Sequence, residues 1–420
     1  MNRLKRKQIS ELVNVHNNKR IPLSAKEREY LIKIYPYYGA QGIVDYVDNF
    51  IFDGEYILVA EDGENLRSNN QNICNLVHGK FWVNNHAHII NANKDNVTKY
   101  LFYNFNLIKF EPFVTGSAQP KLNKENLLRI ETFVHDKLEQ RQIASILSAL
   151  DDKIELNNKI NAELEQMAKT IYDYWFVQFD FPDANGKPYK SSGGKMVWNE
   201  QLKREVPEGW EAGTLEDIAE LIRGVSYSKN DIASDDIKKA IPILRATNIT
   251  SNVIDLKNMV YVPSTLVSDE QILKKFDILM TMSSGSIDHI GKNGFYYFNE
   301  KVSFGTFCAK LVAKNEYRYY LYSYMQSPFL FATIRNECLG TNINNLNGSL
   351  VSGFKLIIPK EKIIKAFNLK VDSFFNLIAN NIKQNQQLSQ LRDWLLPMLM
   401  NGQVTVGEAY EKMERVMKMK

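Results

Sequence analysis

The fold is decided by residues 143–175, which read IASILSALDDKIELNNKINAELEQMAKTIYDYW. One set of side chains recurs along this stretch at alternating spacings of four and three residues: Ile143, Leu147, Leu150, Ile154, Asn157, Asn161, Leu164, Ala168, Ile171 and Trp175. A four-three spacing maintained over several heptads is typical of a helix that packs along one seam of a coiled coil. The sequence therefore predicts a long helix that pairs with another of its kind.

The second helix follows from an internal repeat. Gly116 to Phe176 aligns with Gly340 to Met400 at a constant offset of 224 residues, without a gap. At that offset the seam reappears as Phe367, Val371, Phe374, Ile378, Asn381, Asn385, Leu388, Arg392, Leu395 and Leu399. Arg392 is its one charged interruption. A long internal period sets the architecture, so the function is expected to be performed twice.

Both seams carry two asparagines near their centre, Asn157 and Asn161 in the first and Asn381 and Asn385 in the second. If the helices pack antiparallel about a pseudo-twofold axis, these amide layers meet at that axis. A buried polar layer costs stability but can fix the register of a coiled coil. The alternative is that the four asparagines lie at a loosely packed or solvated point.

Each seam helix is preceded by a compact stretch of mixed character. Short apolar runs predict strands at residues 56–60, 81–83, 87–90, 278–280, 295–298 and 308–312. Ile57-Leu58 corresponds loosely to Ile278-Leu279, and Ala87 to Ala309. Aromatic helices around residues 100–103 and 320–322 are expected to belong to the core.

The predicted fold class is α+β, with two mixed α/β domains separated by two long antiparallel coiled-coil helices in a pseudo-twofold internal repeat. The expected division of the chain is a first domain at 1–137, a first helix at 138–180, a Gly/Pro/Ser-rich linker at 181–210, a second domain at 211–358, a second helix at 359–402 and a charged C-terminal tail at 403–420.

Composition narrows the class of protein but not its function. A net charge of +4 with 24% charged residues gives no case for nucleic acid, although a local basic face remains possible. Three cysteines without a CxxC pair fit a reducing compartment. No apolar run is long enough for a membrane span. We expect a cytoplasmic protein without a membrane partner.

The motif search predicts neither catalytic residues nor metal ligands on this chain. The nearest match to a phosphate-binding loop, Gly285 to Lys292, is one residue too long. No Pro-Pro pair is present for an adenine methyltransferase tetrapeptide. His86 and His88 lack further ligands at metal spacing and fit alternating positions on a strand. Asp151-Asp152 is expected on a solvated helix face, and Asp183 near Lys187 is too weak a signal for a nuclease.

Several long motifs, in order along nearly the whole chain, resemble one family. Residues 139–154, EQRQIASILSALDDKI, strongly resemble the first conserved helix of type I restriction-modification specificity subunits. Residues 116–123, GSAQPKLN, look like the motif that closes their first target-recognition domain. Residues 186–194 and 207–210 are similar to their linker, and residues 37–43, YYGAQGI, resemble a recognition-domain loop. The second copy departs more, since residues 359–392 lack the Glu-Gln-Arg-Gln run.

The resemblance implies a DNA sequence-specificity subunit that is not itself an enzyme. Such a subunit binds a bipartite, asymmetric double-stranded DNA target and two methyltransferase subunits. The complex methylates an adenine in each half-site, and added endonuclease/translocase subunits cleave unmarked DNA with ATP. S-adenosylmethionine, ATP and Mg are then expected on the partners, with no cofactor on this chain.

Residues for reading DNA are sought among amide, hydroxyl and basic side chains in loops. In the first domain the candidates are Tyr37, Tyr38, Gly39, Gln41, Gln119 and Lys121, with Gly42 also allowing close approach of the backbone. In the second domain they are Arg245, Thr247, Asn248, Ser283, Ser284, Thr341, Asn342, Asn344 and Asn345. Each has an alternative role as a turn or capping residue.

Three other functions remain open at this point. One is a specificity subunit of a modification-only methyltransferase, which this sequence does not separate from the first. Another is a coiled-coil adaptor that never touches DNA, which predicts no salt-dependent DNA binding. The last is a self-sufficient enzyme, against which the missing methyltransferase and ATPase motifs argue.

Overall fold

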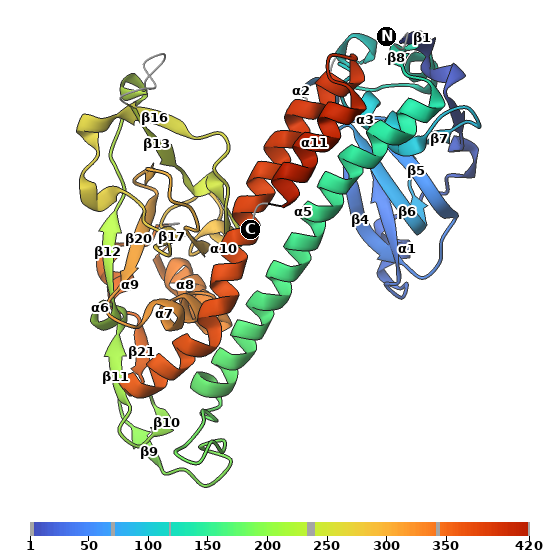
Figure 1. Ribbon diagram of the computed structural model, residues 1–420. Helices are drawn as coiled ribbons and strands as arrows, with labels where there is room; N and C mark the ends of the chain where they lie inside the picture. Colours follow the sequence, from blue (N-terminus) through green and yellow to red (C-terminus); the bar gives the residue numbers. More distant parts are fainter. Residues whose placement is uncertain (1–3, 69–71, 117–118, 233–239, 342–344, 419–420) are drawn as a thin grey trace. The chain divides into compact units, whose positions relative to one another are not determined.

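The computed structural model describes residues 4–68, 72–116, 119–232, 240–341 and 345–418 (Figure 1). The chain forms two compact units. Unit 1 comprises Met1–Leu156 and Gln384–Lys420, and unit 2 comprises Asn157–Lys383. Two long helices, α5 (Lys137–Tyr172) and α10 (Glu361–Met400), run through both units. Each unit therefore contains half of each helix.

Unit 1 is built on a six-stranded sheet in the order β2-β7-β5-β6-β3-β4. Its strands are β2 (Val13–Val15), β3 (Tyr35–Gly39), β4 (Gly42–Val47), β5 (Phe52–Ala60), β6 (Cys74–Val83) and β7 (Ala87–Ala92). The central strand β5 pairs antiparallel with both β6 and β7, whereas β3 joins β6 in parallel. A separate pair, β1 (Lys5–Gln8) with β8 (Glu131–Val134), leads into α5.

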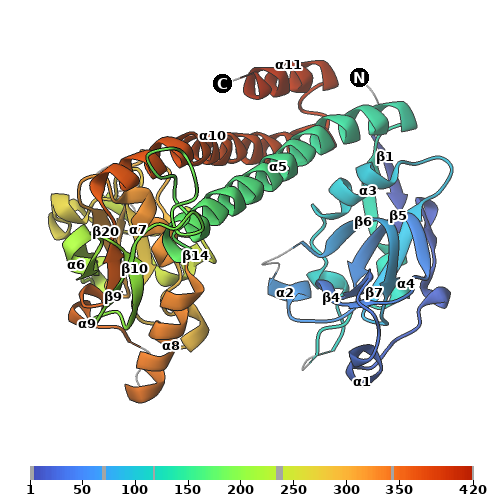
Figure 2. The ribbon, with the colours of Figure 1, turned by 90° about the horizontal axis from the view of Figure 1, so that it is seen from below.

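Unit 1 also contains shorter helices, of which α2, α3 and α4 contribute to the core: α1 (Ala25–Glu29), α2 (Asn65–Ser68), α3 (Thr98–Phe105) and α4 (Lys124–Arg129). One apolar core joins the face of the sheet, α3 and the seam residues Ile143 and Leu147 with Leu395 and Leu399. The strands of this sheet and α3 can be followed in Figure 2. The N-terminal half of α5 and the C-terminal half of α10 thus form a wall of unit 1.

The C-terminal helix α11 (Val406–Met417) belongs to the same core. Thr405 caps its N-terminus in a reciprocal capping box with Glu408. Ala409 and Met413 are buried, and the Lys412 ammonium lies 5.0 Å from the centre of the Trp394 ring on α10. The charged tail expected from the sequence is thus a helix docked on this core.

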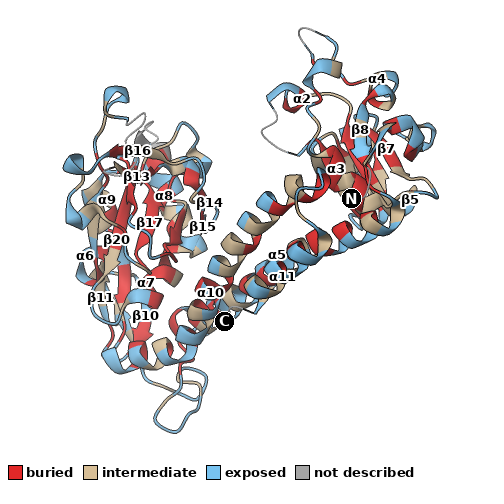
Figure 3. Ribbon diagram, turned by 45° about the horizontal axis from the view of Figure 1, so that its top comes forward, coloured by how far each residue is buried: buried red, intermediate tan, exposed pale blue. Residues whose placement is uncertain are grey.

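Unit 2 contains a four-stranded sheet in the order β12-β20-β17-β18 and a three-stranded sheet in the order β16-β13-β19. These strands are β12 (Ala219–Arg223), β13 (Ala240–Leu244), β16 (Val260–Pro263), β17 (Ile278–Thr281), β18 (Asn293–Phe295), β19 (Ser303–Phe304) and β20 (Cys308–Ala313). Strands β17, β18 and β19 are buried along their whole length, and β20 is buried except at its last two residues; β17 and β20 can be followed in Figure 3. Smaller pairs are β9 (Met196–Asn199) with β10 (Arg204–Pro207), β11 (Glu211–Thr214) with β21 (Lys355–Ile358), and β14 (Ile249–Thr250) with β15 (Val253–Ile254).

Four short helices complete unit 2: α6 (Leu215–Ile218), α7 (Arg318–Met325), α8 (Pro328–Thr341) and α9 (Gly348–Ser352). In this unit the halves of α5 and α10 run antiparallel. Trp175, just beyond α5, lies 6.0 Å by ring centres from Phe367 near the start of α10, while Asn161 contacts Asn381 further along. The mixed fold with paired antiparallel helices confirms the expected class.

The Gly/Pro/Ser-rich segment 181–210 is part of unit 2 rather than a bare connection. Strands β9 and β10 form a hairpin within it, and Phe181 stacks on Trp210 at 4.9 Å and on Tyr189 at 4.7 Å between ring centres. These aromatic side chains join the core of the unit. A composition rich in turn residues does not reveal such contacts.

The offset found in the sequence recurs in local structure. Strands β8 and β21 and the first residues of α5 and α10 lie 224 positions apart. Asn123 caps α4 by accepting from the amide of Asn126 at 2.8 Å, and Asn347 caps α9 by accepting from the amide of Leu350 at 2.7 Å. The repeated Leu-Asn pair is therefore a buried leucine followed by a helix cap.

Three local expectations need correction. Asp151 does not lie on a solvated face, because its carboxylate pairs with Arg392 at 2.7 Å and accepts from the Tyr103 hydroxyl at 2.5 Å. The strand expected at 295–298 ends at Phe295. When Ile57 is matched with Ile278, Ala60 is matched with Thr281. Ala60 pairs with Ala87 and Thr281 pairs with Cys308, so the counterpart of Ala87 is Cys308 and not Ala309.

Candidate nucleic-acid interface

In unit 1, the loop expected at residues 37–43 is the tip of the β3–β4 hairpin. Gly39 faces Gly42, and Ala40-Gln41 makes the two-residue turn. Gly42 has φ of 122°, and a Cβ on Gly39 would lie 2.9 Å from Val44 Cγ1. The turn therefore requires both glycines, and it leaves the Gln41 side chain exposed.

Three further segments meet this hairpin. The Gly63 amide donates to the Pro120 carbonyl at 3.2 Å, and a Cβ on Gly63 would lie 3.7 Å from Gln41 Nε2. The Asn84 amide donates to the Tyr38 carbonyl at 3.0 Å. We call residues 39–42, 61–63, 84–86 and 119–121 loop cluster 1. It brings together Gln41, Gln119 and Lys121, which are all exposed.

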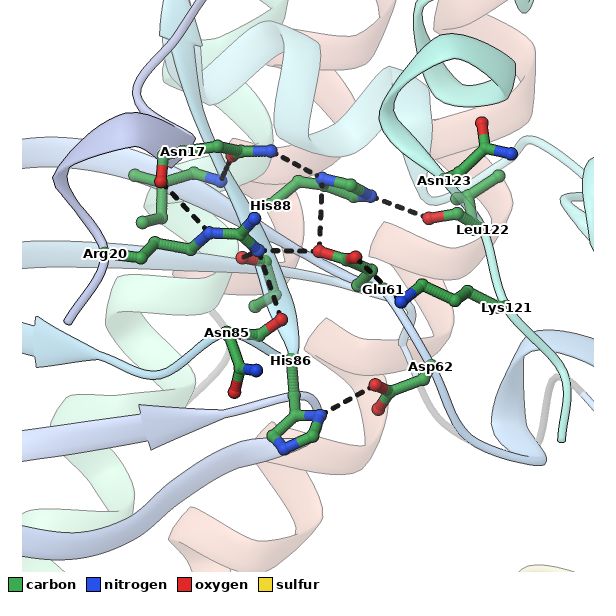
Figure 4. A network of polar contacts seen from close by, with 12 residues as sticks. Asn17, Arg20, Glu61, Asp62, Asn85, His86, His88, Lys121, Leu122 and Asn123 are labelled. Atoms are coloured by element: carbon green, nitrogen blue, oxygen red, sulfur yellow. Dashed lines mark hydrogen bonds and ion pairs between the residues drawn. The ribbon is translucent and has the colours of Figure 1, made fainter. Parts of the chain in front are cut away.

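A polar network lies beneath loop cluster 1 (Figure 4). The Glu61 carboxylate pairs with the Arg20 guanidinium at 2.6 Å and with the Lys121 ammonium at 3.3 Å. Burial raises the pKa of Glu61, but the hydrogen bond from Arg20 and the neighbouring positive charges outweigh burial and hold that pKa below its usual value. Lys121 is thus held by a carboxylate, and a phosphate that binds Lys121 must compete with Glu61.

His88 is the buried member of this network. Its Nδ1 accepts from Asn17 Nδ2 at 2.8 Å, and its Nε2 donates to the Leu122 carbonyl at 2.7 Å. The orientation of Asn17 is set because its Oδ1 accepts from the Ile89 amide. Burial lowers the pKa of His88, so the ring is neutral with its proton on Nε2. His86, by contrast, is exposed, and its Nδ1 lies 2.7 Å from Asp62 Oδ2.

The two tyrosines predicted near DNA lie in strand β3. Tyr37 is buried, and its hydroxyl accepts from the Leu23 amide at 2.9 Å. Tyr38 is half-buried against Phe81, and burial raises the pKa of its hydroxyl. Tyr37 therefore supports the hairpin from inside, whereas Tyr38 remains partly accessible.

In unit 2, the candidate segments converge on the turn at residues 305–307. The Gly305 amide donates to the Leu244 carbonyl at 2.9 Å, directly before Arg245. The Ser283 amide donates to the Phe307 carbonyl at 3.2 Å, and Ser283 bridges to Asn345. We call residues 245–247, 283–285, 305–307 and 345 loop cluster 2.

The members of loop cluster 2 differ in accessibility. Arg245 is exposed and donates from Nη2 to the Asn258 carbonyl at 2.9 Å, and Thr247 and Asn345 are also exposed. Ser283 and Ser284 are half-buried. Asn248 is buried, where its Nδ2 donates to the carbonyls of Asp255 and Lys257 at 2.9 and 2.7 Å. Asn248 therefore shapes the loop, while Asn342 and Asn344 lie outside the described residues.

Some residues of these clusters were missed by sequence reasoning. Phe307 is 63% exposed at the centre of loop cluster 2, and Arg67 donates to the Gly116 carbonyl at 2.5 Å beside loop cluster 1. The only sequence signal for Phe307 was an aromatic residue directly after Gly305-Thr306. Arg20 and Glu61 carried no signal, because the contact between them joins segments far apart in the chain.

Metal ligands and cysteine thiols are two further kinds of group that could carry chemistry. They contain no group of three or more His, Cys, Asp or Glu side chains that could hold a metal ion. Cys74 and Cys308 are buried, and burial raises the pKa of Cys308 to about 12, so the thiol is inert. No helix in the same ranges is long and apolar enough to cross a membrane.

The chain thus has two mixed α/β units, each with half of each seam helix and with its own cluster of polar loops. The family model described as "Type I restriction modification DNA specificity domain" matches residues 1–166 and 207–390, which is most of the chain. The chain therefore belongs to the family of type I restriction-modification specificity subunits, as the sequence motifs predicted.

Individual relatives agree with this family. The type I restriction enzyme MjaIX specificity subunit of Methanocaldococcus jannaschii is 28% identical, over 74% of this chain and 70% of that protein. The HindI specificity subunit of Haemophilus influenzae is 25% identical, over 68% of this chain and 71% of that protein. The crystal structure of the S subunit from M. genitalium has the same fold, with a TM-score of 0.60, 16% identity and coverage of 95% of this chain and 96% of that one.

Proposed function

We propose that this chain is the DNA sequence-specificity subunit of a type I restriction-modification complex, and that it reads one half of a bipartite target with each loop cluster. The observation that carries the proposal is a repeated frame with unlike reading surfaces. The caps Asn123 and Asn347 and the long helices repeat at one offset. Loop cluster 1 instead offers Gln41, Gln119 and Lys121, whereas loop cluster 2 offers Arg245, two serines and Phe307. Two unlike half-sites follow.

The side chains suit the task. Glutamine and asparagine amides pair with adenine edges, and arginine pairs with guanine in the major groove. Lys121 and the backbone at Gly39 and Gly42 would engage phosphate and position the hairpin. We expect Gln41 and Arg245 to contribute most to base readout, one in each half-site, because both are exposed at the tips of their clusters.

The catalytic work would belong to partners. We expect two methyltransferase subunits that supply S-adenosylmethionine chemistry, and endonuclease/translocase subunits that supply ATP- and Mg-dependent cleavage. Specificity subunits of this family are non-catalytic. A modification-only complex, without the nuclease, would use this chain in the same way.

The seam helices would set the gap between the half-sites. Helix α5 has 36 residues, which corresponds to about 54 Å at the usual rise of an α-helix. B-DNA turns once in about 34 Å, so a helix of this length suits half-sites separated by more than one turn.

The test is co-expression of the full chain with the methyltransferase encoded beside it, in a host that lacks other adenine methylation, followed by sequencing of methylated adenines. The expected result is one bipartite target with two unlike half-sites and a fixed gap. A palindromic target, a continuous target or no new methylation would overturn the proposal. Absence of salt-dependent DNA binding by the complex would favour the coiled-coil adaptor instead.

A further inference from the structure

Unit 2 contains a cavity of about 260 Å³ that neither loop cluster uses. Its walls come from helix α5, helix α7, the β14–β15 turn and one residue of α10, Phe375. Apolar side chains of Ala162, Ala168 and Phe375 form part of the lining, and Glu165, Asn252 and Tyr322 add polar groups. All of these residues belong to unit 2.

Glu165 is the charged group of the cavity. Its Oε2 accepts from Asn252 Nδ2 at 2.6 Å. Burial raises the pKa of this carboxyl, and the hydrogen bond from Asn252 offsets that effect only in part. The ammonium at the rim, Lys169, pairs with Asp173, and no ion pair between described residues involves Glu165. A carboxylate in this position gains from an added positive charge.

Tyr322 supplies a second polar group in the wall of the cavity. Its side chain is 4% exposed and lines the cavity, and its hydroxyl makes no hydrogen bond of good geometry, although Asn252 and the Tyr297 hydroxyl lie beside it. The buried Tyr297 hydroxyl likewise makes none. An unpaired buried hydroxyl is costly, and buried polar groups nearly always have partners. A polar group bound in the cavity would complete these contacts.

The internal repeat shows that Glu165 and two other residues of the cavity wall, unlike the seam asparagines, are not repeated in the second copy. At the offset of 224, Glu165 corresponds to Ser389, Ala162 to Gln386 and Lys169 to Asp393. A residue needed only to pair the two seam helices would be expected in both copies, as the asparagines are. The charged cavity wall is instead a property of one unit.

We infer that this cavity binds a guanidinium or alkylammonium group. The cation would pair with the Glu165 carboxylate and donate an N–H to the Tyr322 hydroxyl. The Phe375 ring offers a face for a planar cation or an aliphatic stem. Anions are disfavoured by Glu165, and a neutral ligand leaves the carboxylate without a countercharge. The cation belongs either to a free small molecule or to an arginine or lysine side chain of the methyltransferase partner; only the second source rests on the proposed function.

The test uses agmatine, which carries both cationic groups, titrated calorimetrically into the full chain. N-butylurea is the uncharged analogue. We expect saturable agmatine binding and none with N-butylurea. Glu165→Gln should weaken agmatine binding by about tenfold or more, and Tyr322→Phe by a few-fold. Glu163→Gln, an exposed carboxylate on the same helix, is the matched control and should bind as the unmodified chain does.

Three results would overturn the inference: no heat with agmatine, which means that the cavity holds only water; equal binding by Glu165→Gln; or equal binding of N-butylurea. Circular dichroism and melting of each variant separate lost binding from lost folding, and Tyr322→Phe provides a second route if Glu165→Gln is unstable.

A second arm identifies the source of the cation. If the partner supplies it, agmatine competes with assembly of the methyltransferase complex and Glu165→Gln weakens that assembly. If a free amine is the ligand, assembly is unchanged while agmatine still binds. Failure of the proposed function appears separately, as loss of bipartite methylation in the unmodified complex whatever the calorimetry shows.

Discussion

Asn381 donates a hydrogen bond from Nδ2 to Asn161 Oδ1 at 2.8 Å, and both side chains are buried in the seam within unit 2. Asn161 lies two residues after Lys159, the centre of the first seam, and Asn381 lies two residues before Lys383, the centre of the second. This is the contact expected for antiparallel helices paired about those centres. That this pair fixes the register of the helices is a hypothesis, and the contact identifies Asn161 and Asn381 as the residues on which to test it.

The first prediction compares the substitution of one asparagine of this pair with the substitution of both. Asn381→Leu alone leaves a buried amide on Asn161 without this partner, and we expect a loss of about 1–3 kcal/mol in the free energy of unfolding. The double variant Asn161→Leu/Asn381→Leu replaces an amide layer by an apolar one and should melt at or above the temperature of the unmodified protein. Thermal and urea unfolding of these two variants, of Asn161→Leu and of the unmodified protein gives the coupling energy.

Asn380 provides the matched control, since it is exposed and adjacent to Asn381. Asn380→Leu should change the free energy of unfolding by less than about 0.5 kcal/mol. If the loss in the double variant equals the sum of the losses in the two single variants, the two amides are not coupled. Disulfide trapping across the seam would then report whether the double variant also pairs in shifted registers.

The second prediction concerns pH. Burial lowers the pKa of His88 and also that of His135, where Glu139 and Asp136 oppose the effect in part. In the unfolded chain both imidazoles gain protons near pH 6.5, and in the folded protein only at lower pH. The unfolded state thus binds more protons, so the free energy of unfolding should fall as the pH drops from about 7 to 5, by up to about 1.4 kcal/mol per pH unit and histidine.

Urea unfolding across that range measures the slope. His88→Gln can keep the hydrogen bonds to Asn17 and the Leu122 carbonyl without titrating, so its slope should be shallower. His135→Gln should act likewise, and the double variant should be nearly flat. A slope that survives in the double variant would assign the pH dependence to other groups.

The third prediction assigns the half-sites. In the complex with its methyltransferase, Gln41→Ala should relax base preference in one half-site, and Arg245→Ala in the other. The expected loss of discrimination is about 1–3 kcal/mol at one base pair in each case. Sequencing of methylated adenines reads both half-sites at once. Gln142→Ala, an exposed residue of α5, is the control and should leave both unchanged. Uniform weakening at both halves by Arg245→Ala would indicate a phosphate contact or a folding defect.

The long helices could be predicted from sequence because a seam spacing is a local and repeated signal. Helix α5 ends at Tyr172 and continues as a π-helical turn at Asp173–Val177, close to the end expected from the heptads. The segment 181–210 shows the limit. Its turn residues dominate its composition, while its structure depends on Phe181 stacking on Trp210, a contact across 29 positions that no local pattern reports.

The candidate interface could be predicted only by residue type, because the same side chains cap turns and read bases. Asn248 and Asn345 look equivalent in sequence, yet one is buried with its amide bonded to loop carbonyls and the other is exposed. Glu61 was invisible because it joins Arg20 to Lys121 across separate segments. Local sequence therefore finds the loops, and tertiary contacts decide which side chains in them remain free to bind.

The final prediction tests whether the helices act as a ruler. Because α5 and α10 pair antiparallel, a heptad inserted in one helix alone leaves two turns of seam unmatched. Matched insertions directly after Lys159 and directly before Lys383, the two seam centres, keep every existing pair in register. Each heptad adds about 10.5 Å of helix, or about three base pairs of B-DNA. The gap between half-sites should change by several base pairs, while both half-sites stay the same.

Insertion of seven residues into the 200–203 turn of the β9–β10 hairpin is the control and should leave the gap unaltered. An unchanged gap in the matched variant would show that something other than helix length sets the spacing.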